Sequence, residues 1–294
     1  MTNNHTGYLP STIDQDLVAR FIKESLHEDV GPGDHTSLST IPADKLQSAQ
    51  LLVKDHGVLA GIELAILIFH HVDPLLEVEV LLRDGEIVAP GQVALIVTGR
   101  ARSITIAERL VLNCMQRMSG IATTTWKMVG LVSDLPVKII DTRKTTPLFR
   151  YFEKWAVRIG GGHNHRFALY DMILIKDNHV DYAGGITQAI AAANNYLKEN
   201  KLNLQIEIEV RNFEELQEVL AFGQVNRIML DNFSTDNLRK AIGMIDNKYI
   251  TEASGGITPE TVRAYAETGV DEISVGALTH SIRSLDLSLK AIKQ

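Results

Sequence analysis

Basic residues gather in one part of the sequence, between Lys138 and His179. This window holds eight basic and four acidic residues, whereas the chain as a whole has a formal net charge of -7. Arg143 and Lys144 directly follow a short apolar run, and Lys176 directly ends another. Arginine offers a planar fork to carboxylates and phosphates, and lysine offers them a compact charge. The window therefore predicts a site for a small polyanion.

Glycine turns and carboxylates add to this predicted site. The turn Ser254–Gly256 follows one late apolar run, and Gly276 follows the next. The backbone N–H groups of such turns bind phosphate at the strand ends of β/α barrels. Glu209 and Asp231 follow two earlier runs, where carboxylates can hold Mg²⁺ with pyrophosphate oxygens or stabilise a developing cation. The alternative is an internal ion-pair network, in which Glu207, Glu209 or Asp231 only neutralise the basic residues at the strand ends.

Three further features have a simpler interpretation or stay open. Arg150, Lys154 and Arg158 recur at intervals of four residues, which favours an exposed helix face. The glycines 160–162 form either a flexible loop or a close approach of the backbone to a ligand. Cys114 lies on an apolar helix face and is assigned to the core.

The elements that must position these residues form a repeating pattern. Short apolar runs, each ending in a polar residue or glycine, occupy residues 137–140, 172–175, 206–208, 227–230, 249–253 and 272–275. Helical periodicity follows them, and the last four end 22 or 23 residues apart, which fits one strand, one helix and short loops. Successive βα units favour a parallel β/α barrel over an open doubly wound sheet. The predicted site then lies at the carboxyl ends of the strands.

The first part of the chain has a different pattern. A helical segment at 13–26 precedes alternating strands at 50–54, 75–82 and 93–97, and a second helix covers 103–118. This pattern predicts an antiparallel sheet in an α+β domain. We expect an N-terminal domain at 1–117, a barrel at 118–278, and a C-terminal helix at 279–294 that closes the barrel or packs on the first domain.

Composition excludes several classes of protein. The 294 residues, 45% of them hydrophobic, suit about two globular domains. The longest apolar stretch, 57–72, is interrupted by Glu63, His70 and His71, so we expect no membrane span. The acidic balance argues against nucleic-acid binding through bulk positive charge. A single cysteine and a start unlike a signal peptide predict a reducing, cytoplasmic location.

Motifs over nearly the whole chain resemble those of the quinolinate phosphoribosyltransferase family. They include DTRKTTP at 141–147, GGGHNHR at 160–166, LIKDNH at 174–179, EDVGPGDHTS at 28–37 and MLDNF at 229–233. Their order and spacing together carry the resemblance. One departure is Leu148, which stands where the family usually has glycine, and it puts the conformation of that loop in question.

The resemblance implies a type II phosphoribosyltransferase, with an α/β sandwich domain beside an open-faced, incomplete β/α barrel. The implied reaction joins quinolinate to 5-phosphoribosyl 1-pyrophosphate and gives nicotinate mononucleotide, pyrophosphate and CO₂ in de novo NAD biosynthesis, with Mg²⁺ required. The implied assembly is a homodimer or a dimer-based hexamer with sites shared between subunits. No nucleic acid or membrane partner is implied.

The resemblance also implies roles for individual residues. Those that bind the quinolinate carboxylates are Arg143, His165, Arg166 and Lys176, with Arg109 contributed from the other subunit. Those near the phosphoribosyl pyrophosphate, its ribose and its metal are the catalytic residues Lys144, Lys176, Glu209 and Asp231. Those that bind its 5-phosphate are Ser254, Gly255, Gly256 and Gly276.

Three alternatives stay open at this point. A strand-end lysine such as Lys176 on a phosphate-binding barrel is also typical of a Schiff-base aldolase or decarboxylase. A non-catalytic sensor of pyridine dicarboxylates or phosphosugars would keep the fold but would not need the acidic pair. A related phosphoribosyltransferase for another acceptor, such as nicotinate, needs one carboxylate clamp, whereas the basic set suggests two.

Overall fold

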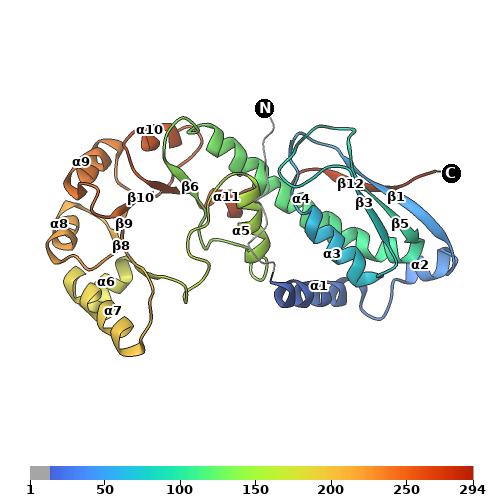
Figure 1. Ribbon diagram of the computed structural model, residues 1–294, viewed down its shortest axis with the longest axis horizontal. Coiled ribbons are helices and arrows are strands. Elements are labelled where there is room, and N and C mark those ends of the chain that lie inside the picture. Colours follow the sequence, from blue (N-terminus) through green and yellow to red (C-terminus); the bar gives the residue numbers. More distant parts are fainter. Residues whose placement is uncertain (1–13, 294) are drawn as a thin grey trace. The chain divides into compact units, whose positions relative to one another are not determined.

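The computed structural model describes residues 14 to 293, which form two compact units of different architecture (Figure 1). Unit 1 contains the described residues up to 126 together with 146–161 and 281–293, and unit 2 contains 127–145 and 162–280. The boundary predicted at 117/118 falls inside helix α4 (Ala101–Gly130), which begins in unit 1 and ends in unit 2. The chain therefore passes between the units more than once.

Unit 1 is built on an antiparallel sheet, as predicted. Its strands are β1 (Leu46–Val53), β3 (Glu77–Val80), β5 (Val93–Arg100) and β12 (Leu287–Ala291), with a separate short pair, β2 (Gly57–Val58) and β4 (Ile87–Val88). Its helices are α1 (Gln15–Val30), α2 (His35–Thr40), α3 (Ile62–Val72), most of α4, and α5 (Arg150–Ile159). The four longer strands lie in the order β12-β1-β5-β3, and every neighbouring pair is antiparallel.

The predicted C-terminal helix is wrong, because this segment forms strand β12. Leu285, Leu287 and Leu289 are buried and alternate with more exposed residues, which is the period of a strand. β12 pairs with β1 through the register Leu51↔Leu289 and so extends the sheet of unit 1 at its edge. A spacing of four between Leu285 and Leu289 also fits a helix, which explains the error.

Helix α5 belongs to unit 1 because a buried ion pair fastens it to α4. Arg117 donates from Nε to Oε1 of Glu153 at 2.7 Å, and the backbone N–H of Thr146 donates to the other carboxylate oxygen at 3.1 Å. The exposed helix face predicted here is wrong for Lys154, which is only 3% exposed. A β-carbon on Gly160 would collide with the carbonyl oxygen of Ala122. This glycine therefore serves helix packing.

The turn before α5 contains the residue that departs from the family pattern. Leu148 has φ 62° and is 91% exposed. This is the left-handed region that favours glycine, and a residue with a side chain pays about 1 kcal/mol to adopt it. The loop therefore keeps a glycine-like turn despite the substitution.

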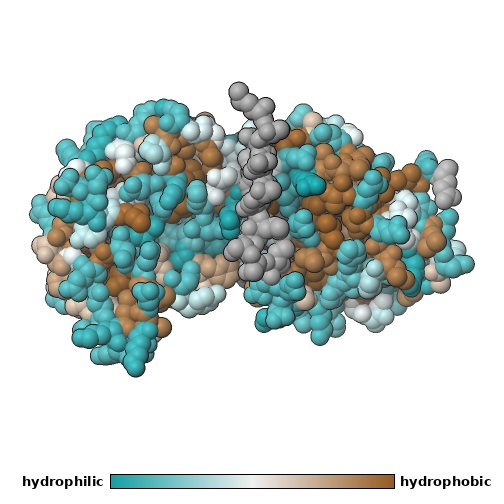
Figure 2. Space-filling view, viewed as in Figure 1, coloured by the Kyte–Doolittle hydropathy of each residue, from teal (hydrophilic) through white to brown (hydrophobic). Residues whose placement is uncertain are grey.

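The surface of unit 1 carries exposed hydrophobic residues. Figure 2 shows hydrophobic side chains gathered on the unit that contains α3 and β3. The exposed large hydrophobic residues of this unit include Leu38, Leu46, Leu67, Leu75, Leu81 and Ile87. Among the described helices, none combines the length and the apolar character that a membrane span needs.

Unit 2 contains the predicted parallel strands, each followed by helical structure. Its strands are β6 (Lys138–Ile140), β7 (Ile173–Ile175), β8 (Ile206–Val210), β9 (Arg227–Asp231), β10 (Ile250–Ser254) and β11 (Glu272–Ser274). Its helices are α6 (Asp177–Ala183), α7 (Ile186–Asn200), α8 (Phe213–Phe222), α9 (Thr235–Ile245), α10 (Val262–Ala266) and α11 (Ala277–His280). The strands lie in the order β6-β11-β10-β9-β8-β7, and helices α6 to α10 line the outer side of the sheet (Figure 1).

The barrel of unit 2 is open between its first two strands. β6 and β7 are the two edges of the sheet and do not pair with each other. The edge of β6 pairs with His163 instead: the N–H of His163 donates to the carbonyl of Ile139 at 2.8 Å, and the N–H of Asp141 donates to the carbonyl of His163 at 3.0 Å. The incomplete, open-faced barrel implied by the family resemblance is confirmed.

A carboxylate from a distant turn caps helix α3 in unit 1. Oδ1 of Asp84 accepts from the N–H of Ile62 at 2.9 Å, while Oδ2 is buried and finds no hydrogen-bond partner within residues 14–293. The residue as a whole is half-buried. Burial of the carboxylate raises the pKa of Asp84 to about 7, although the N–H of Ile62 acts in the opposite direction. The folded protein therefore holds this proton more tightly than the unfolded chain does.

We expect Asp84→Asn to flatten the pH dependence of stability. The stabilisation that comes from protonated Asp84 is complete below its ordinary pKa of 3.8 and is lost as the pH rises through about 7. Between pH 4 and pH 8 the wild type should lose about 1 to 3 kcal/mol more free energy of unfolding than the variant, whose amide oxygen keeps the cap. Urea unfolding at a series of pH values measures this, and parallel curves for the two proteins would contradict it.

Candidate active site

A pocket of about 860 Å³ opens in unit 2 at the carboxyl ends of the parallel strands. The predicted site residues that line it are Arg143, Lys144, His165, Arg166, Lys176, Glu209, Asp231, Ser254, Gly255, Gly256 and Gly276. The exception is Arg109, which is exposed on α4 in unit 1 and lines a second pocket, of about 540 Å³, together with Asp34 and Glu108. The fold thus brings residues far apart in the sequence to one site.

Buried Asp141 holds the loop that carries two of the basic residues. Its side chain is fully buried, and it accepts from the backbone N–H of His165 at 2.9 Å and from Nδ2 of Asn164 at 2.6 Å. On the other side of the gap, Nη1 of Arg166 donates to the carbonyl of Met172, just before β7, at 3.0 Å. The loop is therefore fixed at both edges of the open barrel.

Two arginines lie close enough in the pocket to repel each other. Burial lowers the pKa of Arg166, and the charge of Arg143 lowers it further. The Nε of Arg143 is buried and, among the described residues, has no hydrogen-bond partner. A buried guanidinium nitrogen without a partner calls for a ligand or water. The arrangement suits an anion that lies between the two side chains.

Lys176 and Glu209 form an ion pair at the rim. Nζ of Lys176 lies 3.4 Å from Oε2 of Glu209, and the lysine side chain is 48% exposed. Burial raises the pKa of Glu209, Lys176 counteracts this, and the nearby charge of Asp231 raises it again. The alternative of an internal ion pair is thus correct for these two residues in the unliganded protein. The Glu209 side chain is buried, at 8% exposed, so only the lysine end of the pair is open to an incoming anion.

The two glycine turns approach other residues of the pocket closely. Gly255 has φ 106°, and a β-carbon there would collide with the side chain of Asn232. Asn232 in turn donates from Nδ2 to Oδ2 of Asp231 at 2.6 Å and from its backbone to the carbonyl of Ser254 at 2.9 Å. The turn after β10 and the acidic end of β9 are therefore held together by one asparagine.

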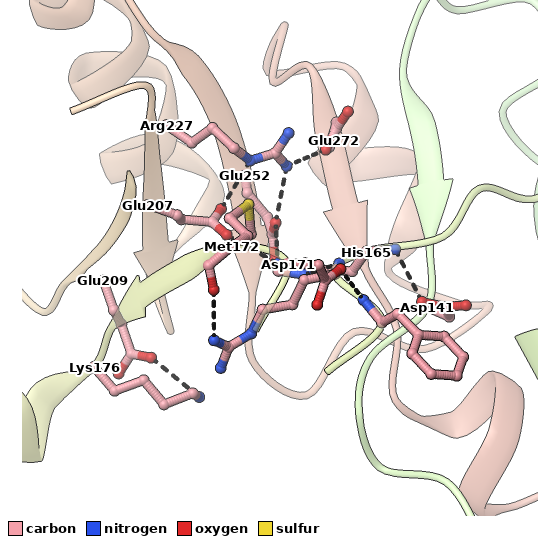
Figure 3. A network of polar contacts seen from close by, with 12 residues as sticks. Asp141, His165, Asp171, Met172, Lys176, Glu207, Glu209, Arg227, Glu252 and Glu272 are labelled. Atoms are coloured by element: carbon pink, nitrogen blue, oxygen red, sulfur yellow. Dashed lines mark hydrogen bonds and ion pairs between the residues drawn. The ribbon is translucent and has the colours of Figure 1, made fainter. Parts of the chain in front are cut away.

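A buried charge cluster (Figure 3) supplies two residues, His165 and Glu252, to the floor of the pocket. Nε2 of His165 lies 2.9 Å from Oε2 of Glu207 and 3.3 Å from Oε2 of Glu252, and both glutamates are fully buried. Arg227 contacts Glu207 at 3.3 Å and Glu252 at 3.4 Å, and it also pairs with Glu272. Each of these side chains comes from a different strand or loop of unit 2.

The cluster shifts the protonation of its members. Burial alone would lower the pKa of His165, but Glu207 and Glu252 outweigh it and raise the pKa to about 9. Burial and the charge of Glu207 raise the pKa of Glu252 to about 7. Glu207 has a lowered pKa, because His165 and Arg227 outweigh its own burial. The two carboxylates therefore favour a proton on Nε2 of His165, the ring atom that faces them.

Two sets of side chains in unit 2 have the chemistry of metal ligands. His165, Glu207 and Glu252 offer ligand atoms within 4.8 Å of one another. Arg227 already supplies positive charge to both carboxylates, so this set is better described as an ion-pair cluster. The predicted pair, Glu209 and Asp231, offers hard oxygen ligands that face the pocket, which suits Mg²⁺.

Sequence reasoning missed several residues of the pocket. They are Thr142, Asn232, Glu252, Thr258, Ser274 and His280. The sequence could have predicted Glu252, since a charged residue at an alternate position of an otherwise buried strand must face the inside of the barrel. No sequence pattern pointed to His280, because it reaches the pocket only through the turn of α11 after Gly276.

The fold and the pocket define a class: a β/α-barrel protein whose strand ends present cations and glycine turns suited to a phosphorylated polyanion. Comparison with known proteins then identifies the family. Residues 34–119 match the N-terminal domain of quinolinate phosphoribosyl transferase, and residues 121–290 match the C-terminal domain. The chain belongs to the quinolinate phosphoribosyltransferase family.

Individual relatives agree over most of their length. The carboxylating chloroplastic nicotinate-nucleotide pyrophosphorylase of Arabidopsis thaliana is 46% identical, with 96% of this chain and 84% of the relative covered. The probable carboxylating nicotinate-nucleotide pyrophosphorylase of Bacillus subtilis is 42% identical, with 89% of each covered. The crystal structure of NadC from Streptococcus pyogenes superimposes with a TM-score of 0.90 at 35% identity and covers 97% of this chain and all of that one.

We expect Gly255→Ala and Gly256→Ala to differ. At Gly255 the added methyl meets both the side chain and the backbone N of Asn232, so the turn must move, at a cost of about 1 to 3 kcal/mol. At Gly256, with φ 58°, no atom lies within 4 Å of the added carbon, and only the strain of about 1 kcal/mol remains. Urea unfolding and titration with inorganic pyrophosphate measure stability and affinity. Equal losses in the two variants would show that contact with Asn232 does not matter.

Proposed function

We propose that this chain is a carboxylating nicotinate-nucleotide pyrophosphorylase of NAD biosynthesis. It joins quinolinate to 5-phosphoribosyl 1-pyrophosphate and forms nicotinate mononucleotide, pyrophosphate and CO₂. The observation that carries this proposal is a single pocket that combines a basic end, two glycine turns and an acidic pair. Two highly anionic substrates need such a combination, and the family membership agrees with it.

The acceptor, quinolinate, binds at the basic end of the pocket. Arg143 and Arg166 lie near each other there, and a carboxylate between them relieves their repulsion. His165 adds a third group from the floor, beside Arg166 in the same loop. Two carboxylates on adjacent ring carbons thus find separate cationic partners, whereas an acceptor with one carboxylate leaves part of this set unused.

The donor, 5-phosphoribosyl 1-pyrophosphate, binds across the late strand ends. The turns at Ser254–Gly256 and Gly276 offer backbone N–H groups to its 5-phosphate. Lys144 and Lys176 line the same pocket and offset the charge of the pyrophosphate. When the donor arrives, Lys176 exchanges Glu209 for phosphate oxygens, which frees the carboxylate to face the ribose.

The residues act by alignment and charge placement. As the bond between C1 of the ribose and the pyrophosphate oxygen breaks, positive charge develops on the ribose, and Glu209 and Asp231 stabilise it. The pyridine nitrogen of quinolinate then forms its bond to C1, and the ring becomes cationic. The C–CO₂ bond next to that nitrogen breaks, its electron pair stays on the ring carbon, where the adjacent cationic nitrogen stabilises it, and a proton then binds that carbon in place of CO₂.

The acidic pair is also suited to a divalent cation. Glu209 and Asp231, directly or through water and pyrophosphate oxygens, would hold Mg²⁺, which supplies charge stabilisation to the leaving pyrophosphate. The donor set supports this proposal, since both ligands are carboxylates and, among the described residues, Lys176 is the one cation paired with either of them.

The proposed assembly is a homodimer or a dimer-based hexamer. Arg109 lies outside the pocket and is exposed on α4, so it is available to complete the site of another subunit. The exposed hydrophobic residues of unit 1 support an interface of this kind. We propose the cytoplasm as its location, although relatives from Arabidopsis and tobacco are named as chloroplastic or mitochondrial.

The geometry disfavours the Schiff-base alternative. A lysine nucleophile is activated by an apolar, desolvated pocket or by a neighbouring cation. Lys176 is instead half-exposed and paired with a carboxylate. Its surroundings therefore suit binding of an anion rather than covalent attack.

We expect the purified protein to release CO₂ from quinolinate only when 5-phosphoribosyl 1-pyrophosphate and Mg²⁺ are present. Chelation of the metal should abolish turnover, and nicotinate should be a poor acceptor because it leaves cationic groups unpaired. Release of ¹⁴CO₂ from carboxyl-labelled quinolinate measures the reaction. Borohydride added during turnover should leave the enzyme active, and a reduced adduct on Lys176 would favour the aldolase alternative.

We expect Arg143→Ala to raise the KM for quinolinate by about 10- to 100-fold, since a charged hydrogen bond to a carboxylate is lost. The KM for 5-phosphoribosyl 1-pyrophosphate should change much less. Arg239→Ala is the matched control, because Arg239 is a half-exposed arginine of unit 2 that pairs with Asp236 and does not line the pocket. Unchanged quinolinate kinetics in Arg143→Ala would remove this residue from the acceptor site.

A further inference from the structure

The buried cluster at the floor of the pocket contacts one edge of the imidazole ring of His165, a predicted substrate-binding residue. The side chain of His165 is only 6% exposed, and its Nε2 faces Glu207 and Glu252 at 2.9 and 3.3 Å. Both carboxylates are fully buried, so water cannot replace these contacts. Figure 3 shows His165 reaching the cluster from its loop, while the glutamates project from the strands.

His165 contacts only part of the cluster. The three carboxylates of the cluster belong to Glu207, Glu252 and Glu272, and its two permanent cations are Arg227 and Lys138, which lies 3.7 Å from Glu272. Arg227 and Lys138 both contact Glu272, whereas His165 contacts only the other two glutamates. The imidazole is therefore the hydrogen-bonding partner of Glu207 and Glu252 at the pocket side of the cluster.

The opposite edge of the imidazole ring is hydrogen-bonded to the backbone of Arg166, the next predicted binding residue. The backbone N–H of Arg166 donates to Nδ1 of His165 at 2.6 Å, which places the ring's proton on Nε2, facing the carboxylates. A second proton on the ring would have to displace this N–H. The orientation of the imidazole and the backbone at Arg166 are thus coupled through a single ring.

We propose that Glu207 and Glu252 are positioning residues for the acceptor: they hold His165 at the floor of the pocket and, through it, set the backbone at Arg166. This inference rests on the proposed function, in which both residues bind quinolinate carboxylates. A cluster that only stabilised the barrel would make all of its glutamates equivalent. Instead, Glu207 and Glu252 reach the acceptor site through His165, and Glu272 does not.

The test compares Glu207→Gln with its matched control, Glu272→Gln. Both glutamates pair with Arg227, but only Glu207 contacts His165. Glu207→Gln should raise the KM for quinolinate about tenfold, with the KM for 5-phosphoribosyl 1-pyrophosphate changed by less than about twofold. Glu272→Gln should leave both KM values within about twofold. Equal effects of the two substitutions on the quinolinate KM would overturn the proposal.

A double-mutant cycle then tests whether the effect passes through the ring. In a His165→Ala background, Glu207→Gln should add less than about twofold to the quinolinate KM, since the group it positions is gone. Full addition of the two effects would overturn the proposal. If Glu207→Gln does not fold, as judged by thermal unfolding, Glu252→Gln replaces it and must give the same selective change. A wild type without quinolinate-dependent turnover would instead overturn the proposed function, and this inference with it.

Discussion

The balance of buried charge inside the parallel sheet is the constraint on which the rest of the site depends. An isolated carboxylate in such a place would cost several kcal/mol, so each needs a cation within reach. The partners come from different strands: Glu207 from β8, Arg227 from β9, Glu252 from β10 and Glu272 from β11. They meet only because the strands are in register, with Glu207 beside Arg227 and Glu252 beside Glu272. Strand pairing and charge pairing therefore support each other.

Ion pairs at two depths of the pocket have different consequences. Removing one partner of the buried cluster leaves an uncompensated charge, a loss of about 3 to 5 kcal/mol in comparable cases. In the pair of Lys176 and Glu209 at the rim, the lysine side chain is 48% exposed, whereas the carboxylate is buried. An anionic substrate can therefore reach the lysine at the rim while the floor stays fixed. Glu209 thus neutralises the charge of Lys176 before the substrate binds, and Lys176 is available to the substrate when it arrives.

The sequence predicted the strand ends well because each is a local apolar run followed by a polar residue or glycine. The position of the pocket then follows, since the carboxyl ends of parallel strands lie at the same edge of the sheet. It failed where one pattern fits two structures, as in Leu285 to Leu289, and where burial depends on tertiary contact, as for Lys154 in α5. The floor was only partly predictable. Glu207 stood out as an ion-pair partner, but its connection to Arg227 and Glu252 depends on register and on the twist of the sheet, which no single segment specifies.

The gap in the barrel explains how the basic loop enters the site. In a closed barrel the edge of β6 would pair with β7. Here that edge bonds to the backbone of His163, so the loop that follows begins already fixed to the sheet. Asp141 at the end of β6 then holds the N–H of His165, and Arg166 reaches across to the carbonyl before β7. A closed sheet would use these backbone groups for itself and leave the loop without an anchor. The missing strand pair is thus the place where two of the predicted acceptor-binding residues are held.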